Sequence, residues 1–86
     1  MGKYMRLRET ILEGSSDNNI DFSDLCQFLA RLGFDERVKG SHHIFTRNDI
    51  PEIINLQPRG SKAKPYQVRQ IRGLIVKHQL GAKDVD

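Results

Sequence analysis

The sequence predicts an α+β domain in which helices pack on one face of a three-stranded antiparallel sheet. Three observations predict it: apolar residues recur at helical spacing in the first third, three short segments bounded by turn residues follow, and a helical pattern closes the chain. The 86 residues suffice for one small domain with a modest core. A functional site in such a domain is expected on an open surface.

The first predicted helix lies near the start of the chain and stops at Gly14. Its apolar residues at helical spacing are Tyr4, Leu7, Ile11 and Leu12. Residues 15–19 are all Ser, Asp or Asn, whose side chains compete with helical backbone bonding. A loop is therefore expected between this helix and the next.

The second predicted helix begins after Asp21, which is a suitable N-cap with Asp24 three residues further on. Gly33 supplies the stop, because glycine readily adopts the left-handed conformation that ends a helix. The expected buried stripe consists of Leu25, Phe28, Leu29 and Leu32. Cys26, the single cysteine, lies beside this stripe and is expected to belong to the core.

Three strands and a final helix follow. The strands are expected over residues 34–38, 42–47 and 52–56, each bounded by Gly, Asn, Asp or Pro. Pro58, Gly60 and Ser61 predict a loop. Pro65 suits the first turn of the last helix. The inward residues of that helix are expected to be Val68, Ile71 and Leu74 or Ile75.

The charge distribution favours a polyanionic partner. The net charge is +3, but residues 53–83 carry seven Lys or Arg and no acid. Such a block raises the local concentration of anions and releases counterions on binding nucleic acid. The alternative is a solvated helix face that keeps the protein soluble.

Composition also bears on the cellular setting and on cofactors. One cysteine permits no disulfide within the chain, and no apolar run approaches the length of a membrane span. We therefore expect a soluble cytoplasmic protein without membrane attachment. One cysteine and three histidines show no zinc-ligand spacing, and no phosphate-binding glycine loop is present. Neither a metal nor a small-molecule cofactor is expected.

The segment 39–44 carries the chemistry, since it places His42 and His43 where a turn at Gly40 meets a strand. Histidine can accept and donate a proton near neutral pH, as phosphodiester cleavage requires. The two rings must lie on opposite faces of the strand, and alternation alone leaves open which of them faces solvent. The competing interpretation is a hydrogen-bonded structural histidine.

The turn Gly33-Phe34, the motif Lys39-Gly40-Ser41-His42-His43-Ile44-Phe45 and the basic C-terminal helix resemble the HicA toxins over about residues 21–80. The resemblance implies a double-stranded-RNA-binding-domain-like α-β-β-β-α fold, cleavage of messenger RNA and neutralisation by a HicB-like antitoxin. It divides the chain into an extension at 1–19, a HicA-like domain at 20–80 and a tail at 81–86.

The resemblance makes His42 the expected catalytic residue, with Gly40 and Ser41 as its turn. Lys39 is expected in support, because a cation at Lys39, Arg37 or Arg47 could offset the charge on the phosphorane, and the sequence leaves open which of them does so. With His42 facing the substrate, alternation places His43 on the helix side with Phe45. The cations expected to bind RNA are Arg37, Arg47, Lys62, Lys64, Arg69 and Arg72. A neutral His42 could take a proton from a ribose 2′-hydroxyl, which would make the chain a metal-independent endoribonuclease. The alternatives are a non-catalytic RNA-binding module and an inactive toxin homologue that acts through a protein partner.

Overall fold

A computed structural model describes residues 2–82, so Lys83 and the rest of the tail beyond it lie outside the described residues. The helices are α1 (Lys3–Glu13), the short 3-10 helix η1 (Asp17–Asn19), α2 (Phe22–Arg31) and α3 (Pro65–His78). The strands are β1 (Asp35–Lys39), β2 (His42–Arg47), β3 (Ile50–Leu56), β4 (Pro58–Arg59) and β5 (Lys62–Ala63). The predicted α+β class is confirmed, including the α-β-β-β-α order of α2, the three long strands and α3.

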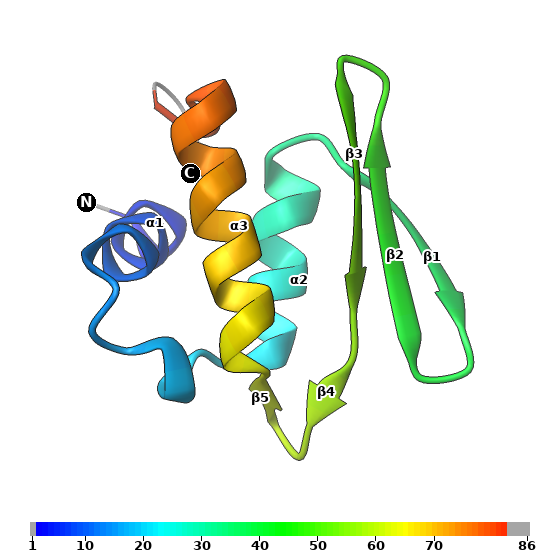
Figure 1. Cartoon of the computed structure of the whole chain (residues 1–86), viewed down its shortest axis with the longest axis horizontal. Coiled ribbons are helices and arrows are strands. Elements are labelled where there is room, and N and C mark those ends of the chain that lie inside the picture. The colour runs from blue at the N-terminus through cyan, green and yellow to red at the C-terminus, as the bar shows by residue number, and fades with distance from the viewer. Residues whose placement is uncertain (1, 83–86) are drawn as a thin grey trace.

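The helices lie on one side of the sheet, with α2 and α3 between it and α1 (Figure 1). The predicted start of α2 is confirmed, because the Asp21 carboxylate accepts a hydrogen bond of 3.0 Å from the backbone N–H of Asp24. At its other end Gly33 takes a φ of 93°, a conformation that favours glycine. Pro65 is the first residue of α3, as predicted.

The main sheet is antiparallel in the order β1-β2-β3. In its register Lys39 lies opposite His42, and Ile44 lies between Arg37 on β1 and Asn55 on β3. The first strand begins one residue later than predicted and the third begins two residues earlier. These shifts leave the faces of the predicted strands unchanged, because the phase of alternation is the same.

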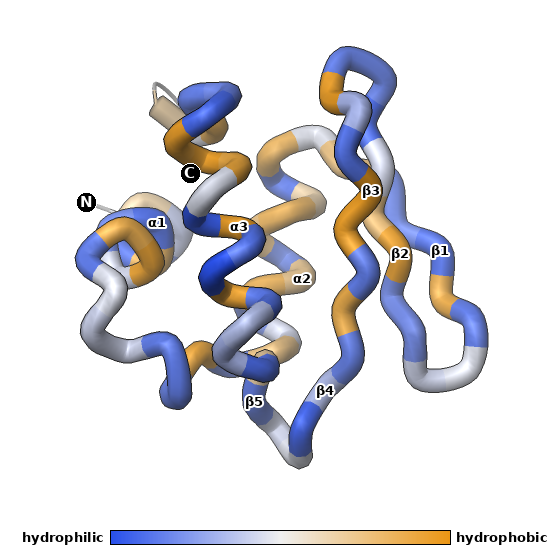
Figure 2. The backbone as a smooth tube through the Cα atoms, in the orientation of Figure 1, coloured by the Kyte–Doolittle hydropathy of each residue, from blue (hydrophilic) through white to orange (hydrophobic). Residues whose placement is uncertain are grey.

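The core lies between the sheet and the helices. Phe45, Ile54 and Leu56 are buried on the helix-facing side, whereas Ile53 and Asn55 are exposed on the other side. Every residue of the apolar stripes predicted for α2 and α3 is buried. Leu74 and Ile75, which the sequence offered as alternatives, are both buried. The hydropathy colouring in Figure 2 shows apolar stretches separated by hydrophilic ones along β3. No described helix covers the opposite face of the sheet (Figure 1).

A short hairpin, β4-β5, occupies part of the region predicted as a loop. It is held to the start of α2 by backbone hydrogen bonds, in which Ala63 N donates to Ile20 O and Phe22 N donates to Ser61 O, both at 2.9 Å. Two-residue strands carry no measurable periodicity, so the pattern along the sequence could not reveal them. The hairpin connects the end of β3 with α3 (Figure 1).

The N-terminal helix contributes to the same core. Ile11 of α1 is fully buried, and Arg8 Nε donates to the carbonyl oxygen of Leu80 at 2.8 Å. The predicted helix at this position is confirmed. Since α1 packs on α3, the described part of the predicted extension, residues 2–19, shares the core of the domain.

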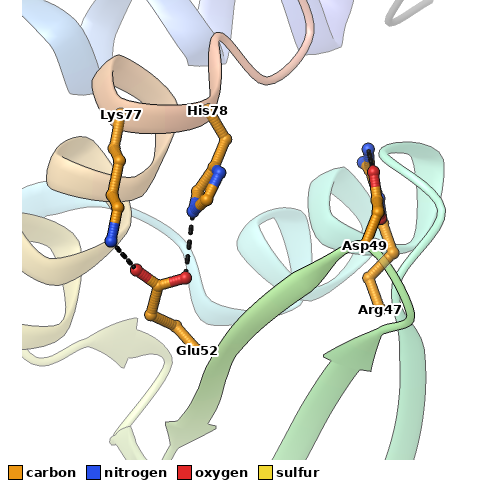
Figure 3. A network of polar contacts seen from close by, with 5 residues as sticks. All are labelled: Arg47, Asp49, Glu52, Lys77 and His78. Atoms are coloured by element: carbon orange, nitrogen blue, oxygen red, sulfur yellow. Dashed lines mark hydrogen bonds and ion pairs between the residues drawn. The ribbon is translucent and has the colours of Figure 1, made fainter.

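The end of α3 is tied to the beginning of β3 by ion pairs. Glu52 accepts from Lys77 Nζ at 2.7 Å and contacts His78 Nε2 at 2.9 Å (Figure 3). These hydrogen bonds lower the pKa of the Glu52 carboxyl to about 2. None of the helices within residues 2–82 is long and apolar enough to cross a membrane.

Candidate functional site

One face of the sheet is covered by no described helix and is called the open face below. It holds the expected catalytic residue and two cations. Residues paired across neighbouring antiparallel strands share a face, so Lys39 lies beside His42 and Arg37 lies beside Ile44. Arg37, Lys39 and His42 are all exposed. A ligand approaching this face would meet an imidazole and two positive charges without any rearrangement of the helices.

The sequence around His42 places its ring at the edge of that face. Gly40 has a φ of 62°, which closes a tight turn between β1 and β2, and β2 begins at His42. Nothing lies within 4 Å of the position that a Cβ of Gly40 would take, so its backbone conformation, rather than crowding, favours glycine.

The orientation of the His42 ring is fixed by Asn55 on β3. His42 Nδ1 lies 3.0 Å from the side-chain oxygen of Asn55. Because an amide oxygen can only accept, this hydrogen bond needs the proton on Nδ1 and leaves the lone pair on Nε2. A neutral imidazole in that tautomer has a base available at Nε2.

A second chain of polar contacts supports the turn beside His42. Gln57 Nε2 donates to Ser41 Oγ at 3.0 Å, and Lys64 Nζ donates to Gln57 Oε1 at 3.3 Å. The side-chain amide of the buried Gln67 lies against the backbone of Gln57. In the amide orientation that satisfies both of its atoms, the amide nitrogen donates to Gln57 O at 3.1 Å and the amide oxygen accepts from Gln57 N at 2.9 Å. The start of α3 is thereby linked to the β1-β2 turn.

His43 lies on the helix-facing side. Its Nδ1 is 2.7 Å from Glu36 Oε2, and its ring meets the edge of Phe22 with centroids 4.9 Å apart and planes at 77°. The expected position of His43 on the helix side is confirmed by these contacts. The adjacent histidines therefore occupy different environments.

Two of the six expected RNA-binding cations are engaged in the framework of the fold. Arg72 donates to Asp17 through both terminal nitrogens, with a shortest distance of 2.6 Å, and both side chains are largely buried. Arg47 forms a two-pronged ion pair with Asp49 at 2.6 and 2.8 Å and also donates to the carbonyl oxygen of Leu32. Figure 3 shows Arg47 and Asp49 side by side.

The other expected cations lie in three places. Arg37 is on the open face with His42, whereas Lys62 and Lys64 are half-buried at and just after β5. Lys64 is linked to the His42 turn through Gln57. Arg69 is exposed on α3, on the helical layer and away from the open face.

Sequence patterns did not identify Asn55 or Gln57. Both contact the turn or the ring only through pairing of β2 with β3, and that register depends on long-range packing. If the register between strands 42–47 and 52–56 had been known, Asn55 would have been placed opposite Ile44 and therefore on the same face as His42.

The comparisons with known proteins give one finding. No curated protein and no solved structure matches this chain. The family model described as the HicA toxin of bacterial toxin-antitoxin systems matches residues 22–82, which include α2, the whole sheet and α3. The match covers well over half of the chain, so this protein belongs to the HicA toxin family.

Proposed function

We propose that this chain is an endoribonuclease that cleaves messenger RNA with His42 as its general base. The observation that carries the proposal is the exposed His42 ring whose Nδ1 is engaged by Asn55, because that contact leaves Nε2 able to accept a proton. Membership of a toxin family supports the same function.

The reaction follows from the position of the base. His42 Nε2 takes the proton of a ribose 2′-hydroxyl, and the 2′-oxygen attacks the adjacent phosphorus. The bond from phosphorus to the 5′-oxygen breaks, that oxygen takes a proton from water, and the protonated His42 returns its proton to solvent. The products carry a 2′,3′-cyclic phosphate and a 5′-hydroxyl. Because the nucleophile belongs to the substrate, the step requires no metal-activated water.

Nearby cations supply electrostatic help. Lys39 lies opposite His42, and Arg37 follows on the same strand and face. Fixed positive charges stabilise the negative charge that develops on the phosphoryl oxygens in the transition state. Ser41, held by Gln57, keeps the turn in place. General-base catalysis contributes about 10² to 10⁴ in rate, which supports a slow enzyme that is still adequate for a toxin.

Family membership also supports a protein partner. We propose that a HicB-like antitoxin neutralises the chain in the cytoplasm, where messenger RNA is available. Covering the open face would block His42, Lys39 and Arg37 together. The exposed Ile53 on the same face offers an apolar contact for such a partner.

The test is cleavage of a single-stranded RNA by purified protein in EDTA, with the ends of the fragments identified by mass spectrometry. The proposal predicts 2′,3′-cyclic phosphate and 5′-hydroxyl ends, and His42→Gln protein purified identically controls for contaminating nucleases. Activity that requires magnesium, or fragments with 5′-phosphate ends, would overturn the mechanism. Tight RNA binding without cleavage would favour the RNA-binding module instead.

A further inference from the structure

Three side chains with metal-binding atoms meet on the helix-facing side of the sheet, away from His42. They are Cys26 of α2, Glu36 of β1 and His43 of β2. One ligand atom from each, a thiol sulfur, a carboxylate oxygen and an imidazole nitrogen, lies within 4.8 Å of the other two. The three come from three different elements, so the fold itself assembles the group.

These separations are close to those of a tetrahedral metal site. Zinc binds nitrogen and oxygen at about 2.0–2.2 Å and sulfur at about 2.3 Å, so two ligand atoms on one ion lie roughly 3.3–3.8 Å apart. The separations between the ligand atoms exceed that range by at most about 1 Å, and the His43 to Glu36 contact of 2.7 Å is shorter than it. Small side-chain rotations would bring all three onto one ion.

The surroundings also suit a cation. The cluster opens into a groove of about 350 Å³ between α2 and β1, whose other lining residues are Phe22, Ser23, Gln27 and Ala30. This lining contains no Lys or Arg, so no positive charge opposes a metal there. A thiolate and a carboxylate together would neutralise the two charges of a divalent ion, and the groove leaves room for a water as fourth ligand.

We propose that Cys26, Glu36 and His43 form a binding site for a zinc ion. A sulfur, nitrogen and oxygen donor set is typical of zinc, whereas magnesium and calcium prefer oxygen alone. The ion would cross-link α2 to the edge strand β1 and to β2. Its role is structural, because the proposed cleavage takes place on the other face of the sheet.

The protonation state of the free thiol determines how zinc binding depends on pH. Burial, together with the charge of Glu36, raises the pKa of the Cys26 thiol to about 12. The metal-free thiol is therefore protonated and a poor nucleophile near neutral pH. Zinc binding must release its proton, so affinity is expected to rise with pH. Sequence spacing gave no sign of the site, because its ligands are brought together only by the pairing of β1 with β2 and the packing of α2.

The first experiment titrates metal-free wild-type protein with Co²⁺, which replaces zinc and has a visible spectrum. The proposal predicts tetrahedral cobalt bands and a thiolate-to-cobalt charge-transfer band that saturate at one ion per chain. Since Cys26 is the only cysteine, that charge-transfer band identifies the ligand without any variant. Zn²⁺ should then displace Co²⁺ and raise the Tm.

Variants sharpen the result. Cys26→Ser should remove the charge-transfer band, and Glu36→Gln, at a partly exposed position that should leave the fold intact, should weaken Zn²⁺ binding at least about tenfold. His78→Gln is the matched control, because His78 also contacts a carboxylate but has no thiol nearby. Absence of the charge-transfer band in wild-type protein would overturn the proposal. Equal weakening of Zn²⁺ binding in His78→Gln and Glu36→Gln would also overturn it.

Discussion

His42 and His43 are neighbours in sequence, yet the two side chains belong to different parts of the molecule. His42 is exposed on the open face and contacts one neutral amide, that of Asn55. His43 is half-buried under α2, where it meets the Glu36 carboxylate and the Phe22 ring. A step of one residue along β2 thus separates a surface available to a ligand from one that is packed.

The difference follows from the alternation of a strand whose sheet is covered on one side. The helix-facing side holds Phe45, Ile54 and Leu56, which stabilise the fold. The open side holds Arg37, Lys39 and Asn55, which are exposed and contribute little to the core. Substitutions on the open side should therefore change activity, and those on the helix side should change stability.

The largest expected effect is that of His42→Gln. We predict that RNA cleavage falls by about 10² to 10⁴, because the general base is lost, while the Tm changes little. His43→Gln is the matched control: it should lower the free energy of unfolding by roughly 1 kcal/mol and leave the cleavage rate of the folded protein intact. Rates in EDTA and thermal melts of both variants test this. An active His42→Gln beside a stable, inactive His43→Gln would reverse the comparison.

A smaller effect is expected at Asn55, which we propose as a positioning residue for His42. Asn55→Ala should reduce the cleavage rate by up to about 100-fold, because the ring loses its orientation. Asn55→Asp instead places a carboxylate beside the ring, which favours its protonated form. The rising limb of the pH profile of kcat/KM should therefore move to higher pH. A profile that stays in place would mean that Asn55 does not act through His42.

The cations can be divided in the same way. Arg72→Gln removes one partner of a largely buried ion pair with Asp17, so we predict a loss of about 1–3 kcal/mol in the free energy of unfolding. Arg37→Gln removes an exposed charge from the open face, so RNA binding should weaken and its dependence on salt should flatten by about one unit of slope. Arg69→Gln, exposed on α3, is the matched charge control. A salt slope of Arg37→Gln equal to that of the wild type would exclude Arg37 from the RNA surface, and a flattened slope of Arg69→Gln would add Arg69 to it.

The smallest effect concerns acid stability on the helix-facing side. Hydrogen bonds from Lys77 and His78 lower the pKa of Glu52 from 4.5 to about 2. The stabilisation is present above pH 4.5 and is lost as the pH falls toward 2, because the unfolded state then binds the proton more readily. The Tm of Glu52→Gln should change less over this interval than that of the wild type. Parallel Tm curves would show that the Glu52 contacts contribute nothing.

The fold could be predicted from local signals because those signals are strong here. Asp21 caps α2, Gly33 ends it and Pro65 begins α3, each for a reason confined to a few residues. Alternation along β2 likewise placed the two histidines on opposite faces. Alternation alone did not say which histidine faces the helices. The resemblance to the HicA toxins, by making His42 catalytic, left His43 for the helix side, and the contact of His43 with Phe22 confirms that position.

What sequence could not predict depends on pairings between distant segments. Asn55 reaches His42 through the register of β3, and Arg72 reaches Asp17 from the other end of the chain. Neither contact leaves a local pattern, since a charged or amide residue looks the same whether its partner is water or protein. The Arg72 and Arg47 side chains therefore resembled free cations in the sequence, although both are engaged in the fold.

The central claim is that RNA meets the open face of the sheet. The most direct measurement adds a single-stranded RNA with 2′-O-methyl groups, which lacks the attacking hydroxyl, to isotope-labelled wild-type protein and follows the NMR signals. We predict that the His42 ring and the amides of Arg37, Lys39 and Asn55 shift together, while the His43 ring and α2 stay in place. Shifts concentrated at His43 and α2, with the open face unchanged, would contradict this account.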